Sequence, residues 1–403
     1  MLTYDYSARN PQTGETVKST LQADSEAAAA KLLSQQGLVA TKITVEGQGF
    51  SFGRSRVGAK DRVLFSRQLS TLINAGLPLI QALRSVTSQT TNNNLKAILA
   101  QIISDVEGGS ALAKSMAKHP RVFNQVYISL ITAGESSGTL DKALERLAIQ
   151  QEKEADLNAK IRGAMIYPII VLVVMVAVVG FMIVKVLPQV KLMYESLDNA
   201  ELPFITRMLL AVSDFTIKYW WIELLILGLA LFFASRWART GPGKEVVDKV
   251  KMKAWPIGPL FMKVYMARFA RTGTTLVASG VPLLQMLDIT AKAVNNVHIE
   301  RSIKRAVEKV KGGKSLAESI ENDSNFLPLV PNMIRIGEQS GSMEEMMAKV
   351  ADYYEKEVDN EVDNISSIIE PVMMVMLGVV AFIIVAAVLL PIYGLAGNSS
   401  LGV

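Results

Sequence analysis

The sequence predicts a mainly α-helical integral membrane protein with two duplicated cytoplasmic helical bundles, three transmembrane helices and a small N-terminal α/β unit. The main observation is a repeat. FSRQLSTLINAGLPLIQAL at residues 65–83 returns as FARTGTTLVASGVPLLQML at residues 269–287, and nine of the nineteen aligned positions are identical. Each copy is followed by an apolar run long enough to cross a bilayer. Half of the 403 residues are hydrophobic, which suits soluble domains tethered by a few membrane helices.

The correspondence between the two copies continues along the chain. The segment GESSG at residues 134–138 matches GEQSG at residues 337–341. Two prolines bracket the apolar run of the first copy, and two prolines bracket that of the second: Pro168, Pro188, Pro371 and Pro391. The pattern is a duplication of one large unit, because the offset far exceeds the 20 to 50 residues of solenoid repeats.

The composition excludes several classes of function. The chain has no cysteine, so disulfides, thiolate metal sites and cysteine nucleophiles are absent. Its two histidines, His119 and His298, have no metal-ligand spacing, and we assign no metal and no cofactor. The net charge of +5 is modest, without basic runs interleaved with aromatic residues, so no nucleic acid is expected as a partner.

The N-terminal residues 1–46 predict a small α/β unit. Two strands flank a turn at Thr13–Gly14, Ser25 caps an alanine-rich helix that ends at Gly37, and alternating apolar residues predict a third strand. The start has no signal peptide, so we expect a cytoplasmic N-terminus. Residues 47–59 are rich in glycine and serine and predict a flexible linker.

Residues 60–163 predict the first cytoplasmic helical bundle. Gly76 is expected to end one helix in the left-handed conformation, and Pro78 suits the first turn of the next. Gly134, Glu135 and Gly138 mark a helix–turn–helix corner before a long charged helix. Short loops between amphipathic helices are typical of an antiparallel bundle.

Residues 167–187 predict the first transmembrane helix, and residues 188–218 an extracytoplasmic loop. The second transmembrane helix is predicted at residues 219–235, where an interfacial helix is the alternative, because the segment is short and contains Glu223. Six Lys or Arg side chains follow it in residues 236–255, against three in the preceding loop, so the later flank is cytoplasmic by the positive-inside rule.

Residues 236–366 predict the second cytoplasmic bundle, residues 372–390 the third transmembrane helix, and residues 391–403 an extracytoplasmic tail. The motif residues of the first bundle recur in it as Gly280, Pro282, Gly337, Glu338 and Gly341. The protein is therefore expected to be a multi-pass protein of a cytoplasmic (inner) membrane.

No segment carries a catalytic constellation. Gly312-Gly313-Lys314-Ser315 resembles the end of a phosphate-binding loop, but it lacks the earlier glycine and follows a helical segment, so we expect no nucleotide site. Glu135 and Glu338 each place one carboxylate at a corner. Such a carboxylate caps backbone N–H groups, binds a divalent cation weakly or contacts a partner, and the sequence leaves these alternatives open.

The motifs resemble a known family. FSRQLSTLINAGLPL, AGESSGTLDKAL, YPIIVLVV and LPFITRMLLAVSDF, with the second copies ARTGTTLVASGVPL and IGEQSGSMEEM, are similar to the bacterial type II secretion F / type IV pilus assembly platform proteins. The resemblance covers essentially the whole chain. It implies a non-enzymatic platform that couples a cytoplasmic assembly ATPase to insertion of pilin or pseudopilin subunits.

The resemblance also implies the partners. They are the hexameric assembly or retraction ATPase, prepilins or pseudopilins, membrane alignment proteins and membrane lipids, and the duplication favours a homo-oligomer. A small transporter or channel subunit is the alternative function, although the three predicted spans offer few polar residues for a pathway. A membrane peptidase would need paired carboxylates within the spans, which the sequence lacks.

Overall fold

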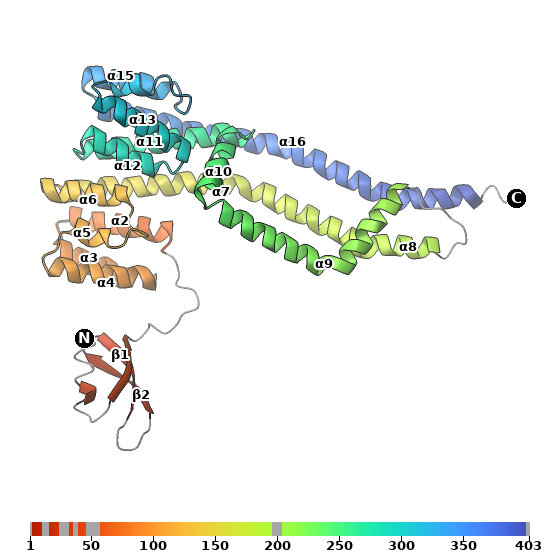
Figure 1. Ribbon diagram of the computed structural model, residues 1–403, viewed down its shortest axis with the longest axis horizontal. Coiled ribbons are helices and arrows are strands. Elements are labelled where there is room, and N and C mark those ends of the chain that lie inside the picture. Colours follow the sequence, from red (N-terminus) through yellow and green to blue (C-terminus); the bar gives the residue numbers. More distant parts are fainter. Residues whose placement is uncertain are drawn as a thin grey trace. The chain divides into compact units, whose positions relative to one another are not determined.

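The computed structural model describes residues 2–9, 16–23, 32–34, 39–45, 57–195 and 204–399. Contacts divide the chain into two compact units, one made mainly of residues 1–57 and the other of residues 58–403 without 91–95. The first unit is a sheet and the second holds both helical bundles and the apolar helices (Figure 1).

The sheet of the first unit has three antiparallel strands in the order β2-β1-β3. They are β1 (Leu2–Arg9), β2 (Thr16–Ala23) and β3 (Val39–Val45), which confirms the three predicted strands. Ala8 and Leu33 are buried. The remaining features predicted here lie outside the described residues: the turn at Thr13–Gly14, the helix ends at Ser25 and Gly37, and most of the linker 47–59.

Each copy of the repeat folds into the same succession of six helices. The first copy comprises α2 (Ala59–Asn74), α3 (Leu79–Gln89), α4 (Asn93–Glu107), α5 (Leu112–Ala117), α6 (Gln125–Ser137) and α7 (Leu140–Phe181). The second comprises α11 (Ile257–Ala278), α12 (Leu283–Ala293), α13 (Val297–Lys311), α14 (Leu316–Ile320), α15 (Leu329–Ser340) and α16 (Met343–Ser399). The predicted duplication of helical bundles is confirmed.

The cores of the two bundles repeat the same aromatic contact. Phe65 in α2 packs against Phe123 with ring centroids 5.9 Å apart, and the equivalent Phe269 in α11 packs against Phe326 at 5.4 Å. All four rings are buried. In each bundle the first helix is thus packed, through an equivalent pair of rings, against the loop that precedes α6 or α15.

The first corner of each bundle has the backbone that the sequence predicts. Gly76 and Gly280 follow α2 and α11 with φ of +85° and +78°, a conformation that residues with a Cβ rarely adopt. Pro78 and Pro282 come two residues later as the N-caps of α3 and α12, one position before the predicted first turn. Proline suits this place because the missing N–H would have no partner inside the helix.

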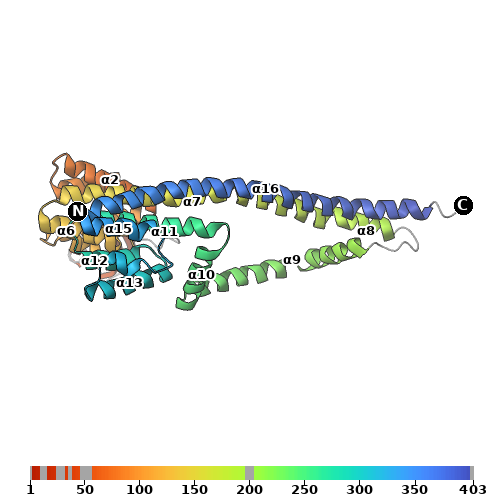
Figure 2. The same cartoon turned by 90° about the horizontal axis from the view of Figure 1, so that it is seen from above.

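The predicted boundaries between bundle and membrane helix do not coincide with breaks in the chain. α7 runs from the first bundle into the predicted span 167–187 and ends within it at Phe181, and Pro168 lies inside the helix. α16 runs from the second bundle through its predicted span and continues through the predicted tail to Ser399. α7 and α16 contact each other near the bundles, where Lys160 of α7 pairs with Asp359 of α16, and both then extend away from the bundles in the same general direction (Figures 1 and 2).

The predicted loop 188–218 is wrong in its secondary structure. A π-helical turn, η1 (Met182–Val186), leads into α8 (Leu187–Glu195), and α9 (Phe204–Trp237) begins well before the predicted span. A hydrogen bond joins α9 to the π-helical turn: the Ser213 hydroxyl in α9 donates to the Ile183 carbonyl in η1 at 2.5 Å. A π-helical turn leaves carbonyl groups out of the regular α-helical pattern, and this contact helps to explain why α9 begins so early. The predicted start of the span, Tyr219, is a kink in α9 with φ −121° and ψ 18°.

Three of the described helices are long and apolar enough to cross a membrane, as predicted: Leu140–Gln189, Leu210–Trp237 and Met343–Ala386. Their apolar side chains face outward, with Phe181, Ile226 and Phe382 at 62%, 60% and 72% exposure. A soluble protein would not leave so many large side chains uncovered. A separate helix, α10 (Gly241–Lys253), joins α9 to the second bundle.

Candidate functional site: the duplicated corners and the bundle interface

The segments GESSG and GEQSG form the end of a helix rather than a loop. α6 and α15 continue to Ser137 and Ser340, so within each segment only the last glycine leaves the helix. Gly138 and Gly341 have φ of 69° and 70° and turn the chain directly into α7 and α16. The corner predicted between residues 134 and 138 is therefore tighter than the sequence suggested.

The glutamate of each corner caps a different helix from its own. The Glu135 carboxylate accepts hydrogen bonds from the N–H groups of Leu112 and Ala113, at 2.6 and 2.9 Å, in the first turn of α5. Glu338 does the same for Leu316 and Ala317 in α14, at 2.6 and 3.0 Å. Both carboxylate oxygens are used in each copy. This geometry supports the capping interpretation, although the cap acts on a neighbouring helix.

The two caps differ in one respect. Ser315 precedes α14, and its hydroxyl accepts a further hydrogen bond from the Glu318 N–H at 3.2 Å. Ala111 holds the equivalent position before α5 and has no side-chain oxygen. Because the first turn of a helix leaves several N–H groups without partners, α5 depends more on Glu135 than α14 does on Glu338.

The first glycine of each corner permits close packing. A Cβ at Gly134 would lie 2.5 Å from the Cβ of Ala143 in α7. A Cβ at Gly337 would lie 3.0 Å from the Cα of Met343 in α16. Contacts this short force the backbone apart, so glycine lets α6 and α15 lie directly against the start of the long helices.

An ion pair missed by the sequence reasoning also occurs in both copies. Arg67 in α2 forms two hydrogen bonds to Glu152 in α7, and the equivalent Arg271 in α11 bonds Glu355 in α16 at 2.7 Å. The signal was present, because both arginines lie in the repeated segment and both glutamates in a repeated Glu-Lys-Glu. The hydrogen bonds from Arg67 lower the pKa of Glu152 below its usual range.

The second copy of this ion pair has become a junction between the bundles. Arg271 also bonds Asp352, and Glu355 lies 3.2 Å from the ammonium group of Lys153 in α7. The side chains of Arg271 and Glu355 are 15% and 11% exposed, whereas those of Arg67 and Glu152 are 40% and 38% exposed. Equivalent pairs therefore have different roles: one stays inside its bundle and the other connects two.

A second contact between the long helices lies two turns further along α7. Lys160 is 2.7 Å from the carboxylate of Asp359 in α16. The hydrogen bond that Lys160 donates to the Asp359 carboxylate raises the pKa of Lys160 above its usual value. α7 and α16 are thus joined by charged groups just before both become apolar.

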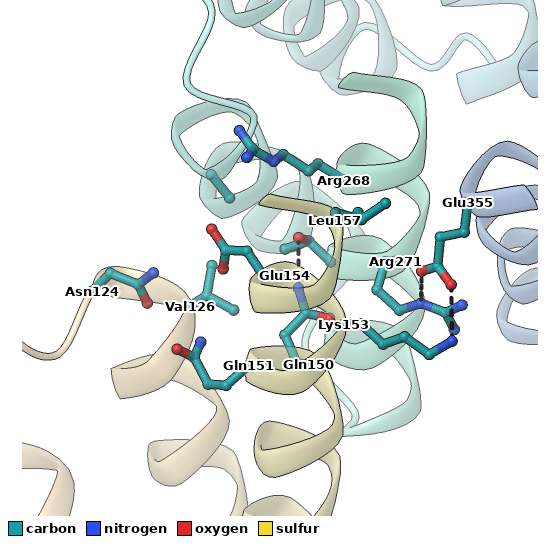
Figure 3. A pocket seen from close by; sticks show the side chains of 12 residues that line it. Asn124, Val126, Gln150, Gln151, Lys153, Glu154, Leu157, Arg268, Arg271 and Glu355 are labelled. Carbon is teal, nitrogen blue, oxygen red and sulfur yellow. Dashed lines mark hydrogen bonds and ion pairs between the residues drawn. The ribbon is translucent and has the colours of Figure 1, made fainter. Parts of the chain in front are cut away.

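The bundles enclose a small polar cavity at this junction (Figure 3). Its volume is about 30 Å³, enough for one or two water molecules and far below the size of a nucleotide site. The amide of Gln150 in α7 donates to Thr272 at 3.3 Å and accepts from Thr275 at 3.1 Å, both in α11. A buried amide with both ends satisfied fixes how α7 lies on α11.

The segment that resembles a phosphate loop has an ordinary structural role. Gly312 and Gly313 end α13, Ser315 caps α14, and Lys314 pairs with Glu318 at 3.1 Å. The segment joins two helices, where a phosphate loop joins a strand to a helix. Within the described ranges, no group of three or more His, Asp or Glu side chains lies close enough to hold a metal ion.

Family models match three segments of the chain, which together make up most of it. The model described as Type II secretion system (T2SS), protein F matches residues 65–188 and again residues 269–391. The model described as Type II secretion system protein F, N-terminal domain matches residues 1–44. The repeated match corresponds to the two copies of the bundle with their apolar helices.

Relatives of similar length are also found. The chain is 40% identical to a type IV pilus assembly protein PilC of Thermus thermophilus, over 99% of this chain and all of the relative. A protein of the same name from Pseudomonas aeruginosa is 36% identical over 91% of this chain and 98% of its own. A type II secretion system protein F of Vibrio cholerae is 31% identical, over 97% and 98%.

The first prediction concerns the glutamate caps. Replacing Glu135 by glutamine removes the charge and turns one acceptor into a donor, so α5 should be destabilised by about 2 kcal/mol. Glu338→Gln should cost about 1 kcal/mol, because Ser315 continues to cap α14. Hydrogen exchange of the full-length protein should then be faster in residues 108–118 and 312–322, respectively.

The matched control for the caps is Glu308→Gln, which removes an exposed glutamate paired with Lys311. Hydrogen exchange of the Glu308→Gln variant should change little, because such surface ion pairs contribute only a few tenths of a kcal/mol to stability. Equal and small effects at Glu135 and Glu308 would contradict the capping role.

The second prediction compares the duplicated ion pairs. Arg271→Gln breaks a largely buried network and should cost about 3 kcal/mol of stability, whereas Arg67→Gln breaks a half-exposed pair and should cost about 1 kcal/mol. The thermal midpoint of the full-length protein in detergent measures both. A larger loss for Arg67→Gln would show that the buried junction carries no extra stability.

The pH dependence of the Arg67 pair follows from the lowered pKa of Glu152. A carboxylate with a lowered folded-state pKa stabilises the fold above its unfolded pKa, about 4.3, and loses this contribution as the pH falls through the folded value. The difference in thermal unfolding midpoint between the wild type and Arg67→Gln should therefore be largest at neutral pH and become smaller under acidic conditions.

Proposed function

The chain belongs to the type II secretion system protein F family, and on this premise we propose that it is a mechanical coupler between a cytoplasmic ATPase and filament subunits in the membrane. Family membership makes it a platform protein of type IV pilus assembly or type II secretion. The proposal adds what such a platform does here. It receives movement at its bundles and passes it to pilin or pseudopilin subunits, without catalysing a reaction of its own.

The observation that carries this proposal is the continuity of α7 and α16. Each begins in a bundle and ends in an apolar segment, so its bundle end and its apolar end belong to one helix. At 1.5 Å per residue, the 57 residues of α16 extend about 85 Å. A rotation of either bundle therefore moves the apolar part of the same helix.

We propose one class of partner for each exposed part of the protein, the bundles and the apolar helices. A hexameric ATPase contacts the bundles, prepilins or pseudopilins contact the apolar helices, and alignment proteins hold the platform in place. The polar junction between the bundles supports relative movement, because interfaces rich in charged groups and water resemble transient rather than permanent contacts. A homo-oligomer would place several such couplers around one filament base.

The orientation we propose places the sheet unit and both bundles in the cytoplasm and the C-terminus outside. Three spans between the N-terminus and the C-terminus require opposite sides. The six Lys or Arg side chains in residues 236–255 support the cytoplasmic assignment of the bundles.

The third prediction tests this orientation. The chain has no native cysteine, so single cysteines report their own position. Ser88→Cys, at an exposed position of α3, should resist an impermeant maleimide on cells with a permeabilised outer envelope. Ser399→Cys, at the end of α16, should be labelled. After lysis both should react, and the reverse pattern on intact cells would overturn the orientation.

The fourth prediction tests the function. Deletion of the gene should abolish the filament or the secretion that depends on it, while the assembly ATPase persists at its normal level. The purified full-length chain should bind that ATPase and raise its rate of ATP hydrolysis.

Two controls separate coupling from catalysis. The chain alone should hydrolyse no nucleotide, and Lys314→Ala, in the segment that resembles a phosphate loop, should retain both binding and filament assembly. Filaments in the deletion strain would refute the platform function, and nucleotide turnover by the chain alone would refute the non-catalytic role.

A further inference from the structure

α10 begins directly against the end of a candidate membrane helix. Only residues 238–240 separate it from Trp237, the last residue of α9. The connection is tight: the Thr240 N–H donates to the Trp237 carbonyl at 2.9 Å, and the Thr240 hydroxyl accepts from the Gly243 N–H at 3.3 Å. A Cβ at Gly243 would lie 1.9 Å from the Trp237 carbonyl oxygen, so only glycine allows this approach.

One face of α10 is fixed on the second bundle by its acidic residues. Asp248 is buried, and its carboxylate accepts a hydrogen bond from the Val297 N–H at the start of α13, at 3.0 Å. Glu245 pairs with Arg301 through two hydrogen bonds of 2.6 and 2.8 Å. Both carboxylates thus point toward α13. The opposite face of α10 therefore points away from α13.

The opposite face is apolar and basic. Its exposed residues recur at helical spacing and form one narrow stripe: Pro242, Val246, Lys249, Val250 and Lys253. Val246 and Val250 are 47% and 55% exposed. Among the described residues, Lys249 and Lys253 form no ion pair within 4.0 Å, unlike the glutamate and aspartate of the inner face.

Exposed aromatic and basic side chains flank α10 in the sequence on both sides. Trp255, just after α10, is 77% exposed, and Trp237, just before it, is 50% exposed. Arg236 and Arg239 are exposed beside Trp237. Tryptophan with lysine and arginine is the combination that proteins place at the boundary between hydrocarbon and headgroups.

We propose that this face of α10 binds the headgroup layer of an anionic lipid bilayer. Lys249 and Lys253 contact lipid phosphates, while Val246, Val250 and Trp255 insert among the upper acyl carbons. Since four residues of chain reach at most about 14 Å, the start of α10 cannot lie far from the membrane boundary at Trp237. The inference rests on the membrane placement of α9 in the proposed function.

The charge distribution favours lipid over a protein partner. The acidic groups of α10 turn inward, where Lys251 lies 3.9 Å from Asp248, and the exposed face carries Lys249 and Lys253 but no acidic residue. This face matches a surface of one sign, such as a leaflet rich in anionic lipid. The contact would hold the second bundle at a fixed height under the membrane. It thereby gives the platform an anchor besides its spanning helices.

Tryptophan quenching tests the position of α10. The four tryptophans are at positions 220, 221, 237 and 255, so phenylalanine at three of them leaves one reporter. The full-length chain carrying only Trp255 is placed in bilayer discs that contain phosphatidylcholine and phosphatidylglycerol. Lipids brominated near the headgroup end of the acyl chain should quench Trp255 more strongly than lipids brominated near the chain terminus.

A lysine pair tests the lipid class. At equal mole fraction, brominated phosphatidylglycerol should quench Trp255 about twofold more than brominated phosphatidylcholine, and about 0.5 M NaCl should reduce this ratio. Lys249→Gln with Lys253→Gln should bring the ratio close to one. Lys96→Gln with Lys142→Gln, at two exposed lysines of the first bundle, makes the same change in charge and should leave the ratio unchanged.

Two further reporters separate the possible failures. A chain that carries only Trp221, in α9, shows whether α9 lies in the bilayer. A chain in which phenylalanine replaces all four tryptophans and which carries Tyr353→Trp gives a reporter on the second bundle that lipid should not quench. Quenching of Trp221 without Trp255 would overturn the lipid contact while keeping the membrane placement. No quenching of Trp221 would overturn both. Equal quenching of Trp255 by both lipids would refute anionic recognition.

Discussion

The structure depends on one constraint: each long helix is partly in a water-soluble bundle and partly in an apolar segment suited to a membrane. α7 and α16 start among the charged and buried residues of a bundle and continue as apolar helices, with Pro168 lying inside α7. A helix can cross this boundary because its backbone hydrogen bonds are internal, and hydrocarbon requires that they are. Each bundle is therefore joined to its apolar segment by a continuous helix and not by a loop.

The duplication explains how two such pieces are held together. Contacts that stabilise a single bundle are kept in both copies, as with the glutamate caps and the Phe65 and Phe269 rings. Contacts between the bundles have to differ, because the same surface meets a different neighbour in each copy. Arg271 and Glu355 show this divergence, since they retain the inherited pair and add Asp352 and Lys153 around it.

Much of the fold was predictable because its signals are local or repeated. Gly76 and Gly280 predicted left-handed helix ends, and the three apolar runs predicted three membrane-spanning helices. The start of α9 was missed, because residues 204–218 mix polar and apolar side chains and their helix is explained by contacts with η1 and α8. The partner of Glu135 was missed for a similar reason. Only the fold brings the first turn of α5, 22 residues earlier in the chain, under that carboxylate.

The bundle junction combines specificity with weak adhesion, and this combination suits a moving part. Its contacts include ion pairs and amide hydrogen bonds around a cavity of about 30 Å³, which Val126 and Leu157 also line. The ion pairs that cross from α7 to α16 start from Lys153 and Lys160, whose side chains are 47% and 37% exposed. Such partly exposed pairs contribute little net stability, yet they define which groups face each other. The proposed coupling function makes use of these contacts: the bundles turn relative to each other across the half-exposed ion pairs, and the apolar helices attached to them follow.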